Sequence, residues 1–151
     1  MNKFMKCAIR EAEKGIRNGE GGPFGTVIVK DGKIIAKGHN QVVKNNDATC
    51  HGEMQALRKA SKRLKNFDLS GCELYTTGEP CPMCLGAILW SNIDRVYYGC
   101  NIEDTEKIGF RDKKFYAFSG EKKAEFVSEL DRNECLKLYE EYQRIDSKKN
   151  Y

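Results

Sequence analysis

Long hydrophobic runs are missing from this 151-residue sequence. No apolar stretch approaches the roughly 20 residues that a helix needs to span a bilayer. Residues 1–7 alternate in the manner of a helix and lack the apolar core of a signal peptide. We therefore expect a cytoplasmic protein that keeps its N-terminus and has no contact with a membrane.

A strong charge of either sign is also missing. Lys and Arg number 26 and Asp and Glu 22, which gives a net charge of +4. The basic cluster Lys59, Lys62, Arg63 and Lys65 fits a solvated helix face, so the charge does not require a nucleic-acid partner. Repeats, low-complexity blocks and linkers are absent as well, and we predict a single domain spanning residues 1–151.

The seven cysteines do not form the pattern of a disulfide framework. Their number is odd, no secretory signal precedes them, and the chain is long enough to fold without crosslinks. Four occur singly, and we expect each of these to be a small buried hydrophobe: Cys7, Cys72, Cys100 and Cys135. Cys81 and Cys84 differ from them because they share the Cys-x-x-Cys spacing.

Four short runs rich in β-branched and aromatic residues predict strands at 26–29, 33–36, 74–77 and 95–98. Asp31-Gly32 separates the first two runs and favours the positive φ angles of a hairpin turn. Helical spacing of apolar residues predicts helices after Asn2, from about His51, after Pro82 and after the Asp131-x-x-Glu134 capping box. The order predicts an α/β sandwich with a mixed sheet. The helix from Met83 to Trp90 is apolar almost all round and should be deeply buried.

Two short segments carry the chemistry: Cys50-His51-Gly52-Glu53 and Glu79-Pro80-Cys81-Pro82-Met83-Cys84. His51, Cys81 and Cys84 offer the imidazole and two thiolates that a tetrahedral Zn²⁺ accepts, and a catalytic site keeps its fourth position for water. The two cysteines are three residues apart, which places both sulfur atoms on one face of a helix's first turn. That location lowers the pKa of a thiol because the helix dipole favours thiolate.

Glu53 follows His51 by two residues and can reach a water at the metal without displacing it. We expect it to shuttle protons. Alternatives are a redox Cys-x-x-Cys pair, a chance His-x-Glu triplet and a structural zinc site, but a structural site needs a fourth ligand. His39 is the one other histidine, and we expect it to face solvent or a loop. The motifs together favour catalysis.

With these residues identified, the chain resembles the cytidine deaminase superfamily, and within it the bacterial guanine deaminases. The resemblance spans nearly the whole chain and is carried by these stretches: 21–25, 29–32, 38–40, 46–47, 80–88, Trp90, 109–112 and 148–151. The His-x-Glu and Pro-Cys-x-x-Cys pair is highly specific for the superfamily. The resemblance implies a three-layer α/β/α sandwich with a mixed central sheet of about five strands.

The resemblance further implies hydrolytic deamination of a free nucleobase by a zinc-activated water, with guanine converted to xanthine and ammonia. On this basis Asn40 hydrogen-bonds the base, Phe24 packs against its ring, and Trp90 also belongs to the substrate site. Asp112 matches a second proton-shuttling carboxylate. Tyr151 matches an aromatic residue that closes over the partner subunit's site in a domain-swapped homodimer.

The sequence departs from the family pattern at Cys50, Gly52, Gly78 and Arg111, which concerns the choice of substrate more than the chemistry. A tRNA adenosine-to-inosine deaminase, a deaminase of cytosine or another purine-like base, and a non-catalytic zinc-binding module are the alternatives. Asp112 and Tyr151 favour a free base over tRNA. The retained Glu53 argues against the non-catalytic module.

Overall fold

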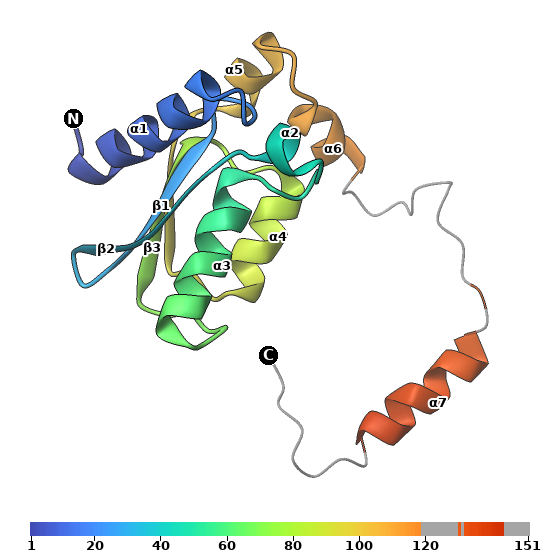
Figure 1. Cartoon of the computed structure of the whole chain (residues 1–151). Helices are drawn as coiled ribbons and strands as arrows, with labels where there is room; N and C mark the ends of the chain where they lie inside the picture. Colours follow the sequence, from blue (N-terminus) through green and yellow to red (C-terminus); the bar gives the residue numbers. More distant parts are fainter. Residues whose placement is uncertain (119–129, 131, 144–151) are drawn as a thin grey trace. The chain divides into compact units, whose positions relative to one another are not determined.

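The computed structural model describes residues 1–118, 130 and 132–143 (Figure 1). The chain divides into two compact units, Met1–Ala117 and Phe118–Tyr151. In chain order the elements are α1 (Lys3–Arg17), β1 (Gly25–Lys30), β2 (Lys33–His39), α2 (Val42–Asn45), α3 (Gly52–Leu64), β3 (Cys72–Gly78), α4 (Pro82–Trp90), β4 (Arg95–Cys100), α5 (Ile102–Lys107), α6 (Asp112–Phe118) and α7 (Arg132–Gln143). Among the described helices, none has the length and apolar character required to cross a bilayer.

The sheet is mixed, as predicted, with strand order β2-β1-β3-β4. β1 pairs antiparallel with both β2 and β3, whereas β3 and β4 are parallel and joined through α4. Each predicted run falls within one of these strands. The described residues form four strands rather than about five. Asp31 and Gly32 turn the hairpin with φ angles of 49° and 70°, the left-handed conformation that this dipeptide favours.

Helices cover both faces of the sheet, which gives the predicted three layers (Figure 1). α1 packs on one face through Ala8, next to Val27, Val29 and Tyr75. The approach is close, because a Cβ atom at Gly25 would lie 2.1 Å from the Ala8 carbonyl oxygen. Asn2 caps this helix as expected, since its side-chain oxygen accepts from two backbone N–H groups of the first turn.

α3 and α4 lie side by side on the opposite face (Figure 1). The core between these helices and the sheet consists of small and branched side chains: Ile28, Ala36, Ala56, Leu57, Ala60, Leu69, Cys72, Leu74 and Ile88. Because α4 follows β3 and leads into parallel β4, the start of α4 lies beside the carboxyl end of β3. The same packing brings the start of α3 to this end of the sheet.

The prediction that α4 is deeply buried was wrong. Cys84 and Ile88 are buried, but Leu85, Leu89 and Trp90 are 37%, 68% and 65% exposed. One side of the helix packs on the sheet and α3, and the opposite side is largely exposed in the described part of the chain. An apolar helix therefore presents an exposed apolar face.

The single cysteines were predicted only in part. Cys72 is buried and Cys7 is half-buried, whereas Cys100 is exposed at the end of β4. Cys100 is the last residue of β4, which forms one edge of the sheet in the described residues. The Cys135 side chain and the expected cap residue Asp131 lie outside the described residues.

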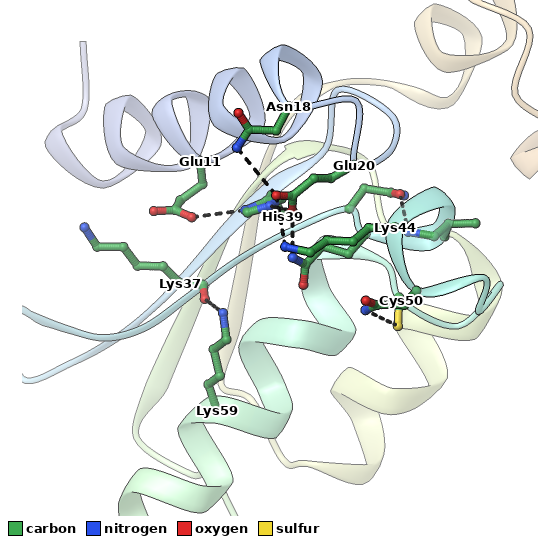
Figure 2. Close-up of polar contacts among 12 residues, drawn as sticks. Glu11, Asn18, Glu20, Lys37, His39, Lys44, Cys50 and Lys59 are labelled. Atoms are coloured by element: carbon green, nitrogen blue, oxygen red, sulfur yellow. Dashed lines mark hydrogen bonds and ion pairs between the residues drawn. The ribbon is translucent and has the colours of Figure 1, made fainter.

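The basic cluster on α3 is not simply solvated. The Lys59 ammonium group donates to the carbonyl oxygen of Lys37 at 3.0 Å (Figure 2), and the Arg63 guanidinium donates to that of Ile35 at 3.1 Å. Both acceptors belong to β2, which is an edge strand. Two cations of the helix thus engage the backbone of the sheet margin.

Candidate functional site

Two helix N-termini meet at the site. His51 is the N-cap of α3 and Cys81 the N-cap of α4, and both have extended backbone angles. Neither side chain caps its own helix, so both are free to turn toward a shared point. Pro82 occupies the first turn of α4, as predicted, where its missing N–H costs no hydrogen bond. The unpaired N–H groups and dipoles of both helices favour thiolate here.

His51, Cys81 and Cys84 form the predicted triad. The His51 Nδ1 atom lies 3.6 Å from the sulfur of Cys81 and 3.6 Å from that of Cys84. Zinc bonds of about 2.3 Å to sulfur and 2.0–2.1 Å to nitrogen, at tetrahedral angles, place such atoms about 3.6 Å apart. Two soft thiolates with one imidazole also match the donors that zinc prefers. The residues therefore fit Zn²⁺ without rearrangement.

The described part of the chain contains no second cluster of this kind and no fourth protein ligand. His39 binds Glu11 and Glu20 instead. Three protein ligands are typical of catalytic zinc, because the fourth position stays open to water.

The ligands influence one another's protonation. Hydrogen bonds from Cys84 and His51 lower the pKa of Cys81 to about 4. The bond to Cys81 raises the pKa of the Cys84 thiol in turn, and burial raises it further. The same contact with Cys81 raises the pKa of His51. A metal ion binds thiolate and neutral imidazole, so zinc binding would displace protons held by Cys84 and His51.

Glu53 lies next to this triad and is buried, with 5% of its surface exposed. Its Oε2 atom is 3.6 Å from the Cys84 sulfur, and its Oε1 atom accepts a hydrogen bond from the Thr76 hydroxyl at 3.3 Å. Thr26 donates to Thr76 at 3.1 Å and completes a buried hydroxyl chain. Burial raises the pKa of Glu53, which suits a group that must both take and release a proton.

A cavity of about 580 Å³ opens in front of the triad and Glu53. Its walls are largely apolar, with these side chains: Phe24, Val42, Val43, Met83, Phe110 and Phe115. Phe24 meets Phe110 edge to face, with 4.8 Å between ring centroids. An apolar cavity of this size with a few polar groups is typical of small-molecule sites.

The cavity brings together most of the predicted site residues. Phe24, Asn40 and Asp112 line it, as do His51, Glu53 and Cys81. Asp112 is the first residue of α6, and burial raises its pKa. Trp90 does not line the cavity and lies at the far end of α4, while Tyr151 lies outside the described residues.

His39 was predicted to face solvent or a loop, and this was wrong. It is 6% exposed and lies between two carboxylates, Glu11 and Glu20 (Figure 2). The His39 ring packs against α1 because Gly15 has no side chain, and a Cβ atom there would lie 2.8 Å from the ring. Sequence reasoning missed Glu20 because it stands in a glycine-rich turn and belongs to no motif.

The departures from the family pattern lie around the cavity. The Cys50 thiol donates to Asp47 at 3.2 Å and accepts from Asn45 at 3.4 Å, so it braces the loop before His51. A Cβ atom at Gly78 would lie 3.1 Å from the Phe24 ring. Arg111 lies over the Phe115 ring at 5.1 Å.

Comparisons with known proteins agree with this geometry. Residues 1–100 match the family model for the cytidine and deoxycytidylate deaminase zinc-binding region. The chain is 50% identical over 113 residues to a guanine deaminase of Bacillus subtilis (strain 168), which covers 75% of this chain and 72% of the relative. It is 39% identical over 135 residues to a tRNA-specific adenosine deaminase of Buchnera aphidicola, covering 89% and 88%.

Solved structures give the same picture. The crystal structure of a guanine deaminase from Bacillus subtilis superposes with a TM-score of 0.91 at 42% identity, covering 100% of this chain and 99% of the other. A guanine deaminase from Nitrosomonas europaea gives 0.68 at 34% identity, covering 71% and 62%. Fold, triad and family match agree, and the chain belongs to the cytidine and deoxycytidylate deaminase zinc-binding family.

Proposed function

We propose that this zinc-dependent deaminase, a hydrolase, converts guanine and water to xanthine and ammonia. The observation that carries the proposal is the arrangement of Glu53 and Asp112 around one apolar cavity beside the triad of His51, Cys81 and Cys84. Similarity to guanine deaminases over most of the chain supports it.

The chain's own residues supply the proton transfers. When bound, zinc supplies the positive charge that lowers the pKa of the attacking water to about 7. The Oε2 atom of Glu53 takes the proton of this water and passes it to N3 of guanine as the oxygen bonds to C2. Glu53 or Asp112 then takes the remaining proton of the former water from the oxygen on C2 and delivers it to the amino group. The amino group leaves C2 as ammonia while the C2 carbonyl of xanthine forms.

Asn40 and Phe24 hold the base in this proposal. The Asn40 side-chain oxygen accepts from the Val42 N–H group at 3.1 Å, so its amide nitrogen is the group that donates to a bound ring. Asn40 is 3% exposed, and its fixed orientation makes the donor specific. Phe24 packs against the ring from the side of Gly78.

The direct test is incubation of the zinc-loaded protein with guanine, with ammonia and xanthine measured in parallel. A panel of adenine, cytosine, their nucleosides and a tRNA anticodon stem-loop serves as comparison. We expect turnover of guanine above all others. Inosine formation in the stem-loop without xanthine from guanine would instead establish a tRNA adenosine deaminase, a class that also occurs among the relatives.

We also propose a homodimer in which a second copy covers the exposed face of α4. Leu85, Leu89 and Trp90 are apolar and open to solvent in the described chain, which is typical of an interface. Tyr151 would reach the partner's site. Light scattering should give twice the 17.2 kDa chain mass, and Leu89→Glu should give the monomer. A monomeric native protein contradicts this.

A reducing compartment suits the protein best, and we propose the cytoplasm. The site needs two thiolates, and the other described cysteines are free thiols. Oxidation of Cys81 and Cys84 to a disulfide would destroy the zinc site. Cell fractionation followed by immunodetection tests this, and recovery outside the cytosolic fraction overturns it.

A further inference from the structure

Glu20 is a buried carboxylate that the reaction described above does not use. It lies between α1 and β1, is 9% exposed and does not line the cavity. Its Oε2 atom accepts from His39 at 2.7 Å and from Gln41 at 2.7 Å. Its Oε1 atom accepts from Lys44 at 3.1 Å and from Asn18 at 3.5 Å. Figure 2 shows Asn18, His39 and Lys44 directed toward the Glu20 side chain.

Three of these donors, His39, Gln41 and Lys44, belong to the segment that forms one wall of the cavity. His39 and Gln41 flank Asn40, and Lys44 belongs to α2, whose Val42 and Val43 also line the cavity. Two backbone bonds reinforce the connection: Lys44 N–H to the Glu20 carbonyl at 3.1 Å, and Asn40 N–H to the Phe24 carbonyl at 2.8 Å.

The residue that follows Glu20 also packs against the Asn40 side chain. The next residue, Gly21, lies so close that a Cβ atom on it would be 2.1 Å from the Asn40 side-chain oxygen. The Glu20 N–H group donates to the Gly15 carbonyl at 2.9 Å, which fixes this turn to the end of α1. Displacement of Glu20 would therefore move Gly21 and residues 41–44, the two segments next to the Asn40 amide.

We propose that Glu20 is a positioning residue for the base: through His39, Gln41 and Lys44 it fixes residues 40–44 so that the Asn40 amide faces the bound ring. The inference rests on the proposed function, because it assigns base binding to Asn40. Glu20 touches no substrate atom and acts only through this segment.

The charge of Glu20 is essential to this role. Only an ionised carboxylate accepts from His39, Gln41 and Lys44 at once, because a neutral amide has one acceptor oxygen and would turn its NH₂ group toward a donor. The hydrogen bonds from His39, Gln41 and Lys44 lower the pKa of Glu20 to about 2, so it stays ionised across the neutral range. Glu20→Gln thus loses the network with little change in volume.

The test is steady-state kinetics of zinc-loaded Glu20→Gln, with Glu13→Gln as the matched control. Glu13 is another glutamate of the α1 region, in an exposed ion pair with Arg17. We expect the KM for guanine to rise about tenfold or more in Glu20→Gln while kcat changes by less than about twofold, the pattern of lost binding. Zinc content and the control's KM should match wild type.

Asn40→Ala connects the effect to its target. If Glu20 acts through Asn40, Glu20→Gln should raise KM by clearly less in the Asn40→Ala background than in wild type, because the two residues act as one unit. Full additivity overturns the inference. So does a loss of kcat and zinc at unchanged KM, which would show that Glu20 serves the fold alone.

A milder variant covers the case in which Glu20→Gln does not fold. Gln41→Met removes one donor and leaves the pair of Glu20 and His39 intact, and we expect about a threefold higher KM. An unchanged KM in Gln41→Met would then overturn the inference. Failure of the proposed function is distinguishable, because wild-type protein would then release no ammonia from guanine at all.

Discussion

Replacement of Glu53 by Gln separates the proton shuttle from the metal site. The exchange is nearly isosteric, and the new amide finds partners for both of its ends. Its oxygen can still accept from Thr76, and its NH₂ group faces the Cys84 sulfur, which accepts. We therefore expect Glu53→Gln to fold and to bind one zinc.

The expected loss of activity follows from the lost proton transfers. A positioned general acid–base contributes about 10²- to 10⁴-fold, which corresponds to about 3–5 kcal/mol in the activation barrier. Ammonia release from guanine measures the rate, and atomic absorption measures zinc in the same sample. Activity above about a tenth of wild type at full zinc occupancy would remove Glu53 from the proposed mechanism.

In the metal-free protein, the same Glu53→Gln substitution should increase stability. Burial raises the pKa of Glu53 above its ordinary value of 4.5. The native state therefore holds this proton more tightly than the unfolded chain, and native stability falls as the pH rises from about 4.5 through the raised pKa. Gln cannot titrate, so apo Glu53→Gln should be more stable than apo wild type at pH 7. Urea unfolding at several pH values in chelator measures this, and equal stabilities at pH 7 would contradict the burial argument.

Three further outcomes follow from the structure. If free zinc was about 1,000-fold above its Kd, its removal by a chelator should lower the free energy of unfolding by about 4 kcal/mol. Calorimetry should then show a Tm lower by roughly 8–16 °C. An unchanged Tm would mean that the triad holds no metal. Thr76→Val should lower kcat about tenfold at unchanged zinc content, because the Thr76 hydroxyl orients Glu53, whereas Thr76→Ser should retain activity. Thr105→Val is the matched control at another buried threonine. Equal kcat values for Thr76→Val and wild type would refute this role. Gly25→Ala should lower the free energy of unfolding, measured in urea, by about 1–3 kcal/mol or more, because α1 must move away from β1. An unchanged free energy of unfolding would contradict the close approach of α1 to Gly25.

Local signals in the sequence predicted the fold well. The Asp31-Gly32 turn, the Asn2 cap and the four strand runs depend on residues that are neighbours in the chain, and all are confirmed. The metal triad was predictable for a similar reason. His51 and the Cys-x-x-Cys pair each begin a helix, and the crossover through α4 brings these two helix starts together.

Features that depend on partners distant in the chain were not predictable. The exposure of α4 depends on which of its sides finds a covering element, and composition alone cannot distinguish a core helix from an interface helix. His39 is buried because Gly15, 24 residues earlier, leaves space for its ring, and Glu20, 19 residues earlier, hydrogen-bonds to it. Glu20 itself had no spacing signal, because His39, Gln41 and Lys44 donate to it from a segment whose path only the fold determines.

The contacts of Lys59 and Arg63 with β2 bear on how the protein behaves at high concentration. An open sheet margin invites a strand from another molecule to dock and continue the ladder, which is the first step toward fibrils. Here two carbonyl groups of the margin are already engaged by long cationic side chains, and an incoming strand would have to expel both charges before it could pair. These two contacts therefore hinder intermolecular strand pairing at the β2 edge of the sheet, and they use residues that take no part in the proposed reaction.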